Sequence, residues 1–391
     1  MPKGGAPQQN KIKVRSQVII DTLNALGYSF RFNELTHVLE VNGSPISDAI
    51  AAAIRTSMRD MDFKGMDAIE DAYVSHAQQN AYHPIRDYFD SLRWDGRCHI
   101  AQLATFFQDS GPVNGETWFY KSFRRWLIGY AARVYDHMQL PMLVLEGLQR
   151  KGKSYFVRWL SSMLPQYFIE APIMPDNKDC LLRLATTFIW EVSELGATMR
   201  RADVEALKSF ITLHHITLRK PYGRHDLHLP AVAGLIGTIN DASGFLNDTT
   251  GSRRALVIPN VEIDWSYVSH VDVNQVWAEA VAAYRAGESN ELDDVERITQ
   301  ATINSTYETP NSVEDLILER FDIDPDKITD PDWFTSANDV RYQVDLELRG
   351  TSQQHALMIA AVLKKHGAIK VNTWLNGKKT RGYWGVKRRG P

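Results

Sequence analysis

The stretch LEGLQRKGKSYFVRWL, residues 145–160, places a glycine, four residues and then Gly-Lys-Ser directly after an apolar run. A strand, a glycine-rich turn and a helix in this order direct backbone N–H groups and the helix N-terminus toward phosphate oxygens. Lys153 supplies a cation for these phosphates, and Ser154 supplies a hydroxyl ligand for Mg²⁺. The sequence therefore predicts a nucleotide phosphate-binding loop (P-loop). Its binding residues are Gly147, Gln149, Arg150, Lys151, Gly152, Lys153, Ser154 and Tyr155.

Two carboxylates follow in the stretch TFIWEVSELGA. Hydrolysis of a bound nucleotide needs an acidic residue linked to the metal and a group that polarises water. We assign Glu191, at the end of a predicted strand, to the metal together with Ser154, and Glu194 to the attacking water. The reverse assignment also fits the sequence, and a solvated strand end is the alternative for either carboxylate.

An amide and two arginines lie farther along the chain. LIGTIN ends a predicted buried strand with Asn240, which can bond the γ-phosphate or orient water, although asparagine is also common in turns. FLNDTTGSRRALVIP places Arg253 and Arg254 on a polar loop before an apolar strand. In a ring of subunits such arginines can reach a γ-phosphate bound by the neighbour, whereas without a ring they are surface charges.

Apolar strands and amphipathic helices alternate from residue 140 to about residue 260. This alternation predicts a parallel or mixed sheet covered by helices. A strongly amphipathic helix is expected over 116–135, and we assign its aromatic stripe to core packing rather than to a ligand. Before it, helices are predicted over 46–61 and 67–81, and FRFNELTHVLEVNG suggests a short hairpin.

The chain has 391 residues with 44% apolar content, which is enough for more than one core. The only cysteines, Cys98 and Cys180, lack metal-ligand spacing and are expected to be packed thiols. No apolar run approaches the ~20 residues that span a bilayer, so we expect a soluble, cytoplasmic protein with no membrane partner. We divide the chain into an α-rich N-terminal region, a P-loop ATPase domain with a leading helix, an acidic connector and a basic C-terminal domain: 1–105, 106–285, 286–332 and 333–391.

The C-terminal segment 351–391 holds nine lysines and arginines and no acidic residue. Two predicted helices precede a hairpin whose turn is Asn376-Gly377, a pattern typical of a winged-helix-like domain. We expect Lys378, Lys379 and Arg381 at the tip to contact nucleic-acid phosphates. A solvated charged face is the alternative.

Seven motifs in one order, NAYHPIRDYFDSLRWDG, LVLEGLQRKGKS, IWEVSELGA, LKSFIT, LRKPYGR, GTIN and FLNDTTGSRR, resemble the virulence-associated protein E family. These are P-loop ATPases of phages and mobile elements, related to superfamily 3 helicases. The resemblance covers about residues 70–265 and implies an α/β fold with an AAA+-like core of superfamily 3 type. It also implies ATP and Mg²⁺ as ligands, a hexameric ring, and action on DNA in the cytoplasm of a bacterial host. The family usually has a small residue at the position of Arg150, so this departure puts the hydrolysis rate in doubt.

In superfamily 3 relatives, a hairpin between the acidic strand and the asparagine strand enters the central channel. The corresponding stretch here is HHITLRKPYGRHDLHLPAV, in which a turn at Pro221–Gly223 is plausible. Cations and an aromatic ring there are suited to phosphates and bases, with pairing of Arg219 and Arg224 to Asp226 as the alternative. The residues expected to contact DNA are Arg219, Lys220, Tyr222, Arg224 and His225.

These features predict an ATP-dependent DNA helicase or translocase that acts on single-stranded or forked DNA in replication of a phage or mobile genetic element. The alternative is a nucleotide-switched DNA-binding or regulatory protein with little ATP turnover, and Arg150 favours it. DNA-stimulated ATP hydrolysis discriminates between the two.

Overall fold

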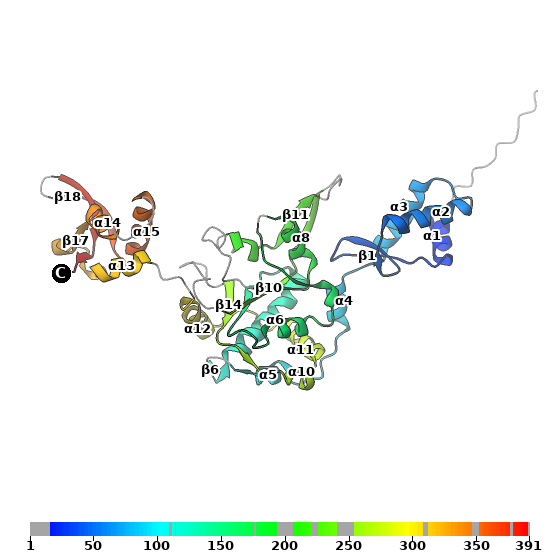
Figure 1. Cartoon of the computed structure of the whole chain (residues 1–391), viewed down its shortest axis with the longest axis horizontal. Helices are drawn as coiled ribbons and strands as arrows, with labels where there is room; N and C mark the ends of the chain where they lie inside the picture. Colours follow the sequence, from blue (N-terminus) through cyan, green and yellow to red (C-terminus); the bar gives the residue numbers. More distant parts are fainter. Residues whose placement is uncertain are drawn as a thin grey trace, which may run out of the picture. The chain divides into compact units, whose positions relative to one another are not determined.

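The computed structural model describes residues 16–108, 112–113, 115–175, 177–193, 206–207, 209–219, 226–240, 254–307, 312–345, 352–375 and 378–389. The chain forms two compact units that divide between Tyr307 and Glu308. Figure 1 shows the helices and strands along the chain. Each unit has an apolar core of its own.

The first unit begins with helices packed on a short sheet of order β3-β2-β1-β4. The expected hairpin is confirmed, because β1 and β2 pair antiparallel with Phe30 opposite Val41. The N-terminal region therefore contains a sheet as well as the helices that the sequence predicts. Its elements are α1 (Ser16–Ala25), β1 (Phe30–Asn33), β2 (Val38–Val41), β3 (Ser44–Pro45), α2 (Asp48–Asp60), α3 (Met66–Gln79) and β4 (Ala81–Tyr82).

The long helix α6 (Trp118–Asp136) begins at Thr117, whose side chain accepts a hydrogen bond from the backbone N–H of Tyr120. Its aromatic residues Phe119, Phe123 and Trp126 are fully buried, which confirms the assignment of the stripe to core packing. The preceding elements are α4 (Pro84–Ser91), α5 (His99–Ala104), β5 (Phe107–Gln108), β6 (Pro112–Val113) and β7 (Glu116–Thr117).

A parallel sheet of order β14-β8-β13-β10-β9 follows, as the alternation of elements predicts. Of the strands in this sheet, β8 comes first in the chain, and it lies between the two that come last, β13 and β14. The strand order therefore reverses next to β8, and the loop that follows β8 begins at this point. Such points are the usual ligand sites of open parallel sheets. The elements are β8 (Met142–Glu146), α7 (Lys153–Leu160), β9 (Phe168–Glu170), α8 (Lys178–Thr186), β10 (Ile189–Ser193), β13 (Gly234–Ile239) and β14 (Ala255–Ile258).

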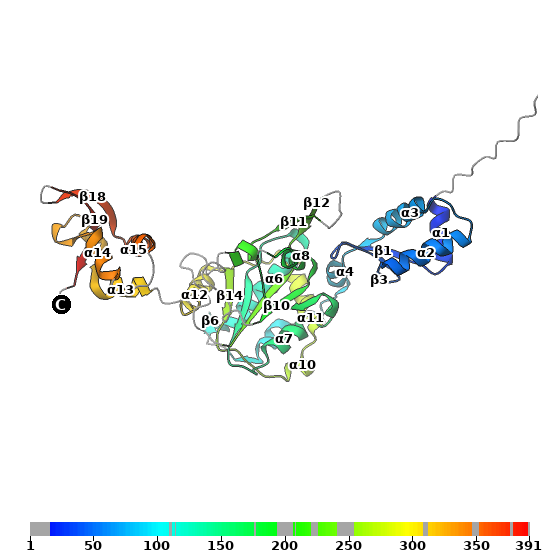
Figure 2. The same ribbon diagram turned by 45° about the horizontal axis from the view of Figure 1, so that its top comes forward.

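Both faces of this sheet are covered. In β8, Leu143 and Leu145 enter an apolar core with α6, α7 and α11 (Val273–Arg285), while Met142 and Val144 enter a second core with α8. Figure 2 shows α6, α7, α8 and α11 around the sheet. Because both faces are buried, every residue of β8 is buried, which explains its continuous apolar sequence.

Hairpin β11 (His215–Arg219) and β12 (Asp226–Pro230) lies between β10 and β13 in the chain, where the sequence predicts a hairpin. After the sheet come β15 (Glu262–Ile263), α10 (Tyr267–His270), α11 and α12 (Asp294–Ser305). Helix α12 packs on the sheet edge, because the buried side chains of Gln300 and Asn304 both donate to the carbonyl oxygen of Ala255. The segment predicted as a connector therefore begins with a helix of the first unit.

The second unit packs three helices on two small sheets, of orders β17-β19-β18 and β16-β20. The order of two helices and a hairpin is the predicted one, and Leu375 opposite Lys378 leaves two residues for the loop. The end of the predicted connector, α13 and β16, belongs to this core. The elements are α13 (Ser312–Arg320), β16 (Phe321–Ile323), β17 (Phe334–Ser336), α14 (Ala337–Asp345), α15 (Ser352–Lys365), β18 (Ile369–Leu375), β19 (Lys378–Trp384) and β20 (Val386–Arg388).

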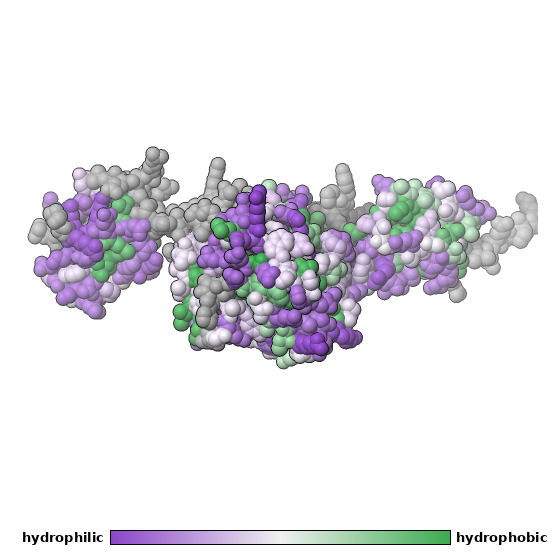
Figure 3. Space-filling model, turned by 60° about the horizontal axis from the view of Figure 1, so that its bottom comes forward, coloured by the Kyte–Doolittle hydropathy of each residue, from purple (hydrophilic) through white to green (hydrophobic). Residues whose placement is uncertain are grey.

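Hydrophilic residues cover most of the visible face of the second unit, at the left of Figure 3. Within the described residues of both units, no helix has the length and apolar character needed to cross a bilayer. The described part of the chain also contains no group of three or more histidine, cysteine, aspartate and glutamate residues able to hold a metal ion.

Candidate nucleotide site

The loop between β8 and α7 is shaped by two glycines. A Cβ at Gly147 would lie 2.7 Å from the carbonyl oxygen of Val261, so no side chain fits there without backbone movement. Gly152 ends the loop with φ 87°, a left-handed conformation that glycine adopts without strain, and helix α7 begins at the next residue. The strand, loop and helix that the motif predicts are thus present, with the helix N-terminus at the loop.

Lys153 is buried, with 5% of its surface exposed. Its Nζ donates to the carbonyl oxygens of Gly147 at 2.6 Å and Leu148 at 2.8 Å, and to Oδ1 of Asn240 at 3.1 Å. Burial lowers the pKa of Lys153, because the ammonium loses solvation. The structure therefore brings together the lysine and the asparagine that the sequence predicts as site residues.

Glu191 lies in the middle of β10 and is fully buried. The Thr238 hydroxyl donates to its Oε1 at 3.3 Å, whereas Oε2 has no hydrogen-bond partner within the described residues. Burial raises the pKa of Glu191, the Ser154 and Thr238 hydroxyls oppose this shift, and the Glu170 carboxylate adds to it. A buried carboxylate oxygen without a donor beside a serine hydroxyl is a suitable ligand set for Mg²⁺, so Ser154 and Glu191 fit the assigned metal role.

Two cations, Arg150 and Lys151, directly precede Gly152 in the loop. Arg150 has φ 65°, a left-handed conformation that is uncommon for residues other than glycine. Lys151 pairs with Glu262, with Nζ 2.5 Å from Oε1. Arg150 therefore adopts the backbone conformation that glycine at this position would adopt more readily.

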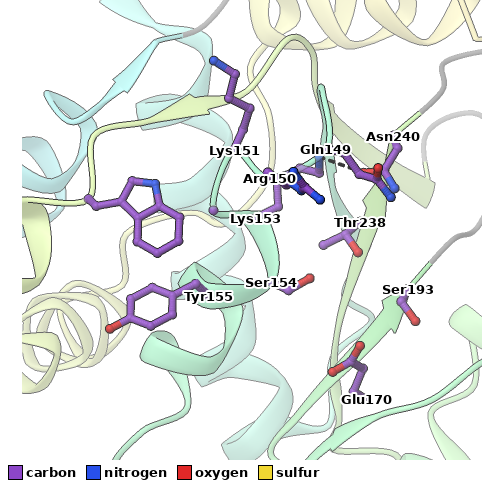
Figure 4. A pocket seen from close by; sticks show the side chains of 12 residues that line it. Gln149, Arg150, Lys151, Lys153, Ser154, Tyr155, Glu170, Ser193, Thr238 and Asn240 are labelled. Atoms are coloured by element: carbon purple, nitrogen blue, oxygen red, sulfur yellow. Dashed lines mark hydrogen bonds between the residues drawn. The ribbon is translucent and has the colours of Figure 1, made fainter.

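One cavity of about 500 Å³, shown in Figure 4, is bordered by most of these groups, whereas the buried Glu191 does not line it. All of the predicted loop residues except Gly147 line it, and so does Asn240. Thr238 and the aromatic ring of Trp265 line it as well, although neither is among the predicted site residues. The lining residues are Gln149, Arg150, Lys151, Gly152, Lys153, Ser154, Tyr155, Glu170, Ser193, Thr238, Asn240 and Trp265.

A model of the virulence-associated protein E-like domain matches residues 89–309. The chain belongs to this family. The match includes the cavity, the hairpin β11–β12 and helix α12, whereas the second unit lies outside it almost entirely. The resemblance that the seven motifs carry is thereby confirmed.

Two apo structures of the NrS-1 C-terminal region have similar folds. One has a TM-score of 0.54 at 14% identity and covers 95% of this chain and 99% of that chain. The other has a TM-score of 0.52 at 13% identity and covers 94% and 98%. At this identity the likeness concerns the fold alone, which is a mixed α/β fold. No curated protein matches the chain significantly.

Arg254 lies at the amino ends of the strands of the parallel sheet, opposite to the carboxyl ends where the loop after β8 begins. It directly precedes β14, whose first residue, Ala255, pairs with Met142 at the start of β8, whereas the P-loop follows the end of β8. The four residues of β14 separate the amino and carboxyl ends of the strand by about 13 Å. The structure therefore places Arg254 away from the cavity of its own chain.

Several predicted site residues lie outside the described part of the chain. They are Glu194, Lys220, Tyr222, Arg224, His225 and Arg253. Arg219 ends β11 opposite Asp226 in the backbone register. Its DNA contact and its pairing to Asp226 both remain predictions.

The three predicted DNA-contacting residues of the second unit are exposed on hairpin β18–β19. Lys379 pairs with Trp374, and Arg381 pairs with Asn372, so these four side chains lie on one face of the hairpin. Trp374 is 72% exposed. This face, which we call the cationic hairpin face, combines two cations with an exposed aromatic ring.

Proposed function

We propose that this chain is a Mg²⁺-dependent ATPase that drives helicase or translocase activity on single-stranded or forked DNA, in replication of a phage or mobile element. One observation carries the proposal. Lys153, Asn240 and Ser154 converge at one cavity from two separate segments, next to the buried carboxylate of Glu191. The wall of this cavity is a loop at a helix N-terminus, which is the arrangement that binds polyphosphates.

Lys153 binds phosphate by exchanging partners. Its three N–H donors point at two loop carbonyls and the Asn240 amide, and phosphate oxygens that enter the loop would take over these donors. Burial disfavours the ammonium, and the negative charge of a phosphate stabilises it. Asn240, released from Lys153, is then positioned to bond the γ-phosphate or the attacking water.

Ser154 and Glu191 would hold Mg²⁺, which would neutralise the negative charge that develops on the phosphate during transfer. The second carboxylate, Glu194, orients the attacking water in this proposal. Thr238 positions Glu191 through its hydrogen bond to Oε1. The carboxylate thus has one oxygen fixed by the protein and one available to the metal.

We place the protein in a hexameric ring in the cytoplasm of the bacterial host. The position of Arg254 supports this. It lies at the amino ends of the strands, away from the cavity of its own chain, and an arginine there is suited to contact a phosphate bound by a neighbouring subunit. The cationic hairpin face and the hairpin β11–β12 supply the DNA contacts in this proposal. An AAA+-like core and a winged-helix-like second unit are the fold assignments that accompany it.

A nucleotide-switched DNA-binding protein is the second candidate, and the backbone of Arg150 favours it. A left-handed arginine at φ 65° limits how the loop can rearrange during turnover. Such a protein binds ATP and assembles on DNA but releases little phosphate.

Steady-state ATP hydrolysis with Mg²⁺, with and without single-stranded DNA at low salt, tests the proposal. We expect DNA-stimulated turnover in the wild type and in Lys64→Ala, an exposed lysine far along the chain from the loop, and none in Lys153→Ala. Near-zero turnover by the wild type together with tight ATP-dependent DNA binding would reject the motor and support the switch.

A further inference from the structure

An exposed aromatic pair borders the P-loop. The rings of Tyr155 and Trp265 stack with centroids 5.0 Å apart and planes inclined by 25°. They are 46% and 52% exposed, whereas Trp118, Trp126 and Trp277 of the same unit are fully buried. The pair lines the cavity with Lys153 and Ser154, and Figure 4 labels Tyr155 among the side chains drawn there. Packing in the core therefore does not explain it.

The pair lies where a nucleotide bound at the loop needs a partner for its base. Tyr155 directly follows Ser154, and a Cβ at Gly152 would lie 3.2 Å from the Trp265 ring. Phosphates held by the loop and the start of α7 leave the ribose and base at the border of the loop. The aromatic pair forms the apolar part of that border.

Trp265 is held in this position by several contacts. Its segment is tied to the P-loop by the backbone N–H of Val261, which donates to the carbonyl oxygen of Glu146 at 2.6 Å, and by the ion pair of Lys151 with Glu262. The backbone N–H of Asp264 donates to the carbonyl oxygen of Phe106 at 2.8 Å, next to the pairing of β15 with β5. A ring fixed in this way loses little conformational freedom when a ligand stacks on it.

We propose that Tyr155 and Trp265 form the platform on which the nucleobase stacks. This inference rests on the proposed nucleotide function of the same cavity. Stacking recognises the aromatic surface of a base rather than its hydrogen-bonding edge, so it favours the larger purines. The site therefore takes purine nucleoside triphosphates, discriminates little between adenine and guanine, and binds pyrimidine nucleotides more weakly.

Calorimetric titration of the full chain with ATP, GTP, CTP and inorganic tripolyphosphate, each with Mg²⁺, tests the platform. Tripolyphosphate occupies the loop without a base. We expect Trp265→Ala to bind ATP and GTP about tenfold more weakly, to lose the preference over CTP, and to bind tripolyphosphate as the wild type does. Trp265→Phe should keep most of the ATP affinity, and Trp94→Phe, a change at an exposed tryptophan outside the cavity, should keep all of it.

The outcomes separate the two proposals. Unchanged ATP affinity in Trp265→Ala, or an equal loss for ATP and tripolyphosphate, would overturn the base platform without rejecting the ATPase proposal. If the wild type bound neither ATP nor tripolyphosphate, the ATPase proposal would fail and the platform with it.

Discussion

The cavity of the candidate nucleotide site and the cationic hairpin face differ in how their charged side chains are placed. Lys153 and Glu191 are buried, and each is hydrogen-bonded to a residue of another segment, since Lys153 donates to Asn240 and Glu191 accepts from Thr238. Lys379 and Arg381 are exposed on one face of a two-stranded hairpin. The electrostatic interactions of buried charges are little affected by salt. Those of exposed charges are weak, screened by salt, and add up over several residues. Large single-residue effects are therefore expected in the cavity and small, salt-dependent effects on the hairpin.

Arg254 provides the strongest test of this contrast, because it lies outside the cavity but should have a very large effect. We expect Arg254→Ala to lower ATP turnover about 10³-fold if the arginine completes a neighbour's site. ATP binding to the same chain should change little, because Arg254 lies at the amino ends of the strands and the cavity lies at their carboxyl ends. Steady-state hydrolysis and calorimetry measure the two quantities.

Mixing experiments show whether Arg254 acts between subunits. Arg254→Ala and Lys153→Ala are each expected to be inactive alone. A mixed ring contains interfaces with an intact lysine on one side and an intact arginine on the other, so mixing should restore part of the activity. Absence of recovery in verified mixed assemblies would exclude action between subunits.

Glu191→Gln should show the large effect expected of a buried group. We expect turnover to fall about 10²-fold, because a neutral amide cannot supply the carboxylate charge to the metal. Tripolyphosphate binding through the loop should persist. Glu70→Gln, at an exposed position of α3, is the matched control. Normal turnover in Glu191→Gln would remove this residue from the mechanism and leave the metal to Glu194.

The hairpin should show the opposite behaviour. We expect Lys379→Ala with Arg381→Ala to weaken DNA binding about tenfold at low salt and to reduce the slope of log affinity against log salt by about two. Trp374→Ala should weaken binding of single strands while leaving that slope unchanged, because stacking releases no counterions. Fluorescence anisotropy over a salt series measures both, with Lys327→Ala as the control. An unchanged slope in the double variant would mean that these cations do not contact phosphates.

The sequence predicted which helices and strands form better than it predicted which of them lie next to one another. Each strand of the parallel sheet is a recognisable apolar run, but strand order depends on contacts between distant segments. Strands β3 and β4 have two residues each, too few to show a periodicity. Lys153 and Asn240 were found because they belong to recognisable motifs. Thr238 could have been found as well, because it lies two residues before Asn240 and therefore on the same face of the strand.

Trp265 could not have been found in that way. It lies after β15, a two-residue strand, and it comes near the P-loop only because β15 pairs with β5 and Val261 bonds to Glu146. The buried state of Glu191 was also beyond the sequence, since a glutamate at a strand end is more often solvated. Sequence reasoning thus identified the loop residues that line the cavity, including Tyr155, but not Trp265, the other ring of its aromatic border.

The buried charge of Glu191 should also affect stability, in a pH-dependent way. Burial raises its pKa above the ordinary value of 4.5, so the folded chain binds this proton more tightly than the unfolded chain. Its stabilising contribution is present at pH below that ordinary value and is lost as the pH rises through the higher folded pKa. Glu191→Gln removes this loss, and we expect the melting temperature measured by scanning calorimetry with chelator to rise by about 2 °C near pH 8. The rise should shrink as the pH is lowered toward the ordinary value of 4.5, because the folded wild-type carboxyl then becomes protonated. A rise independent of pH would instead point to improved packing, and a decrease at pH 8 would contradict the buried-charge account.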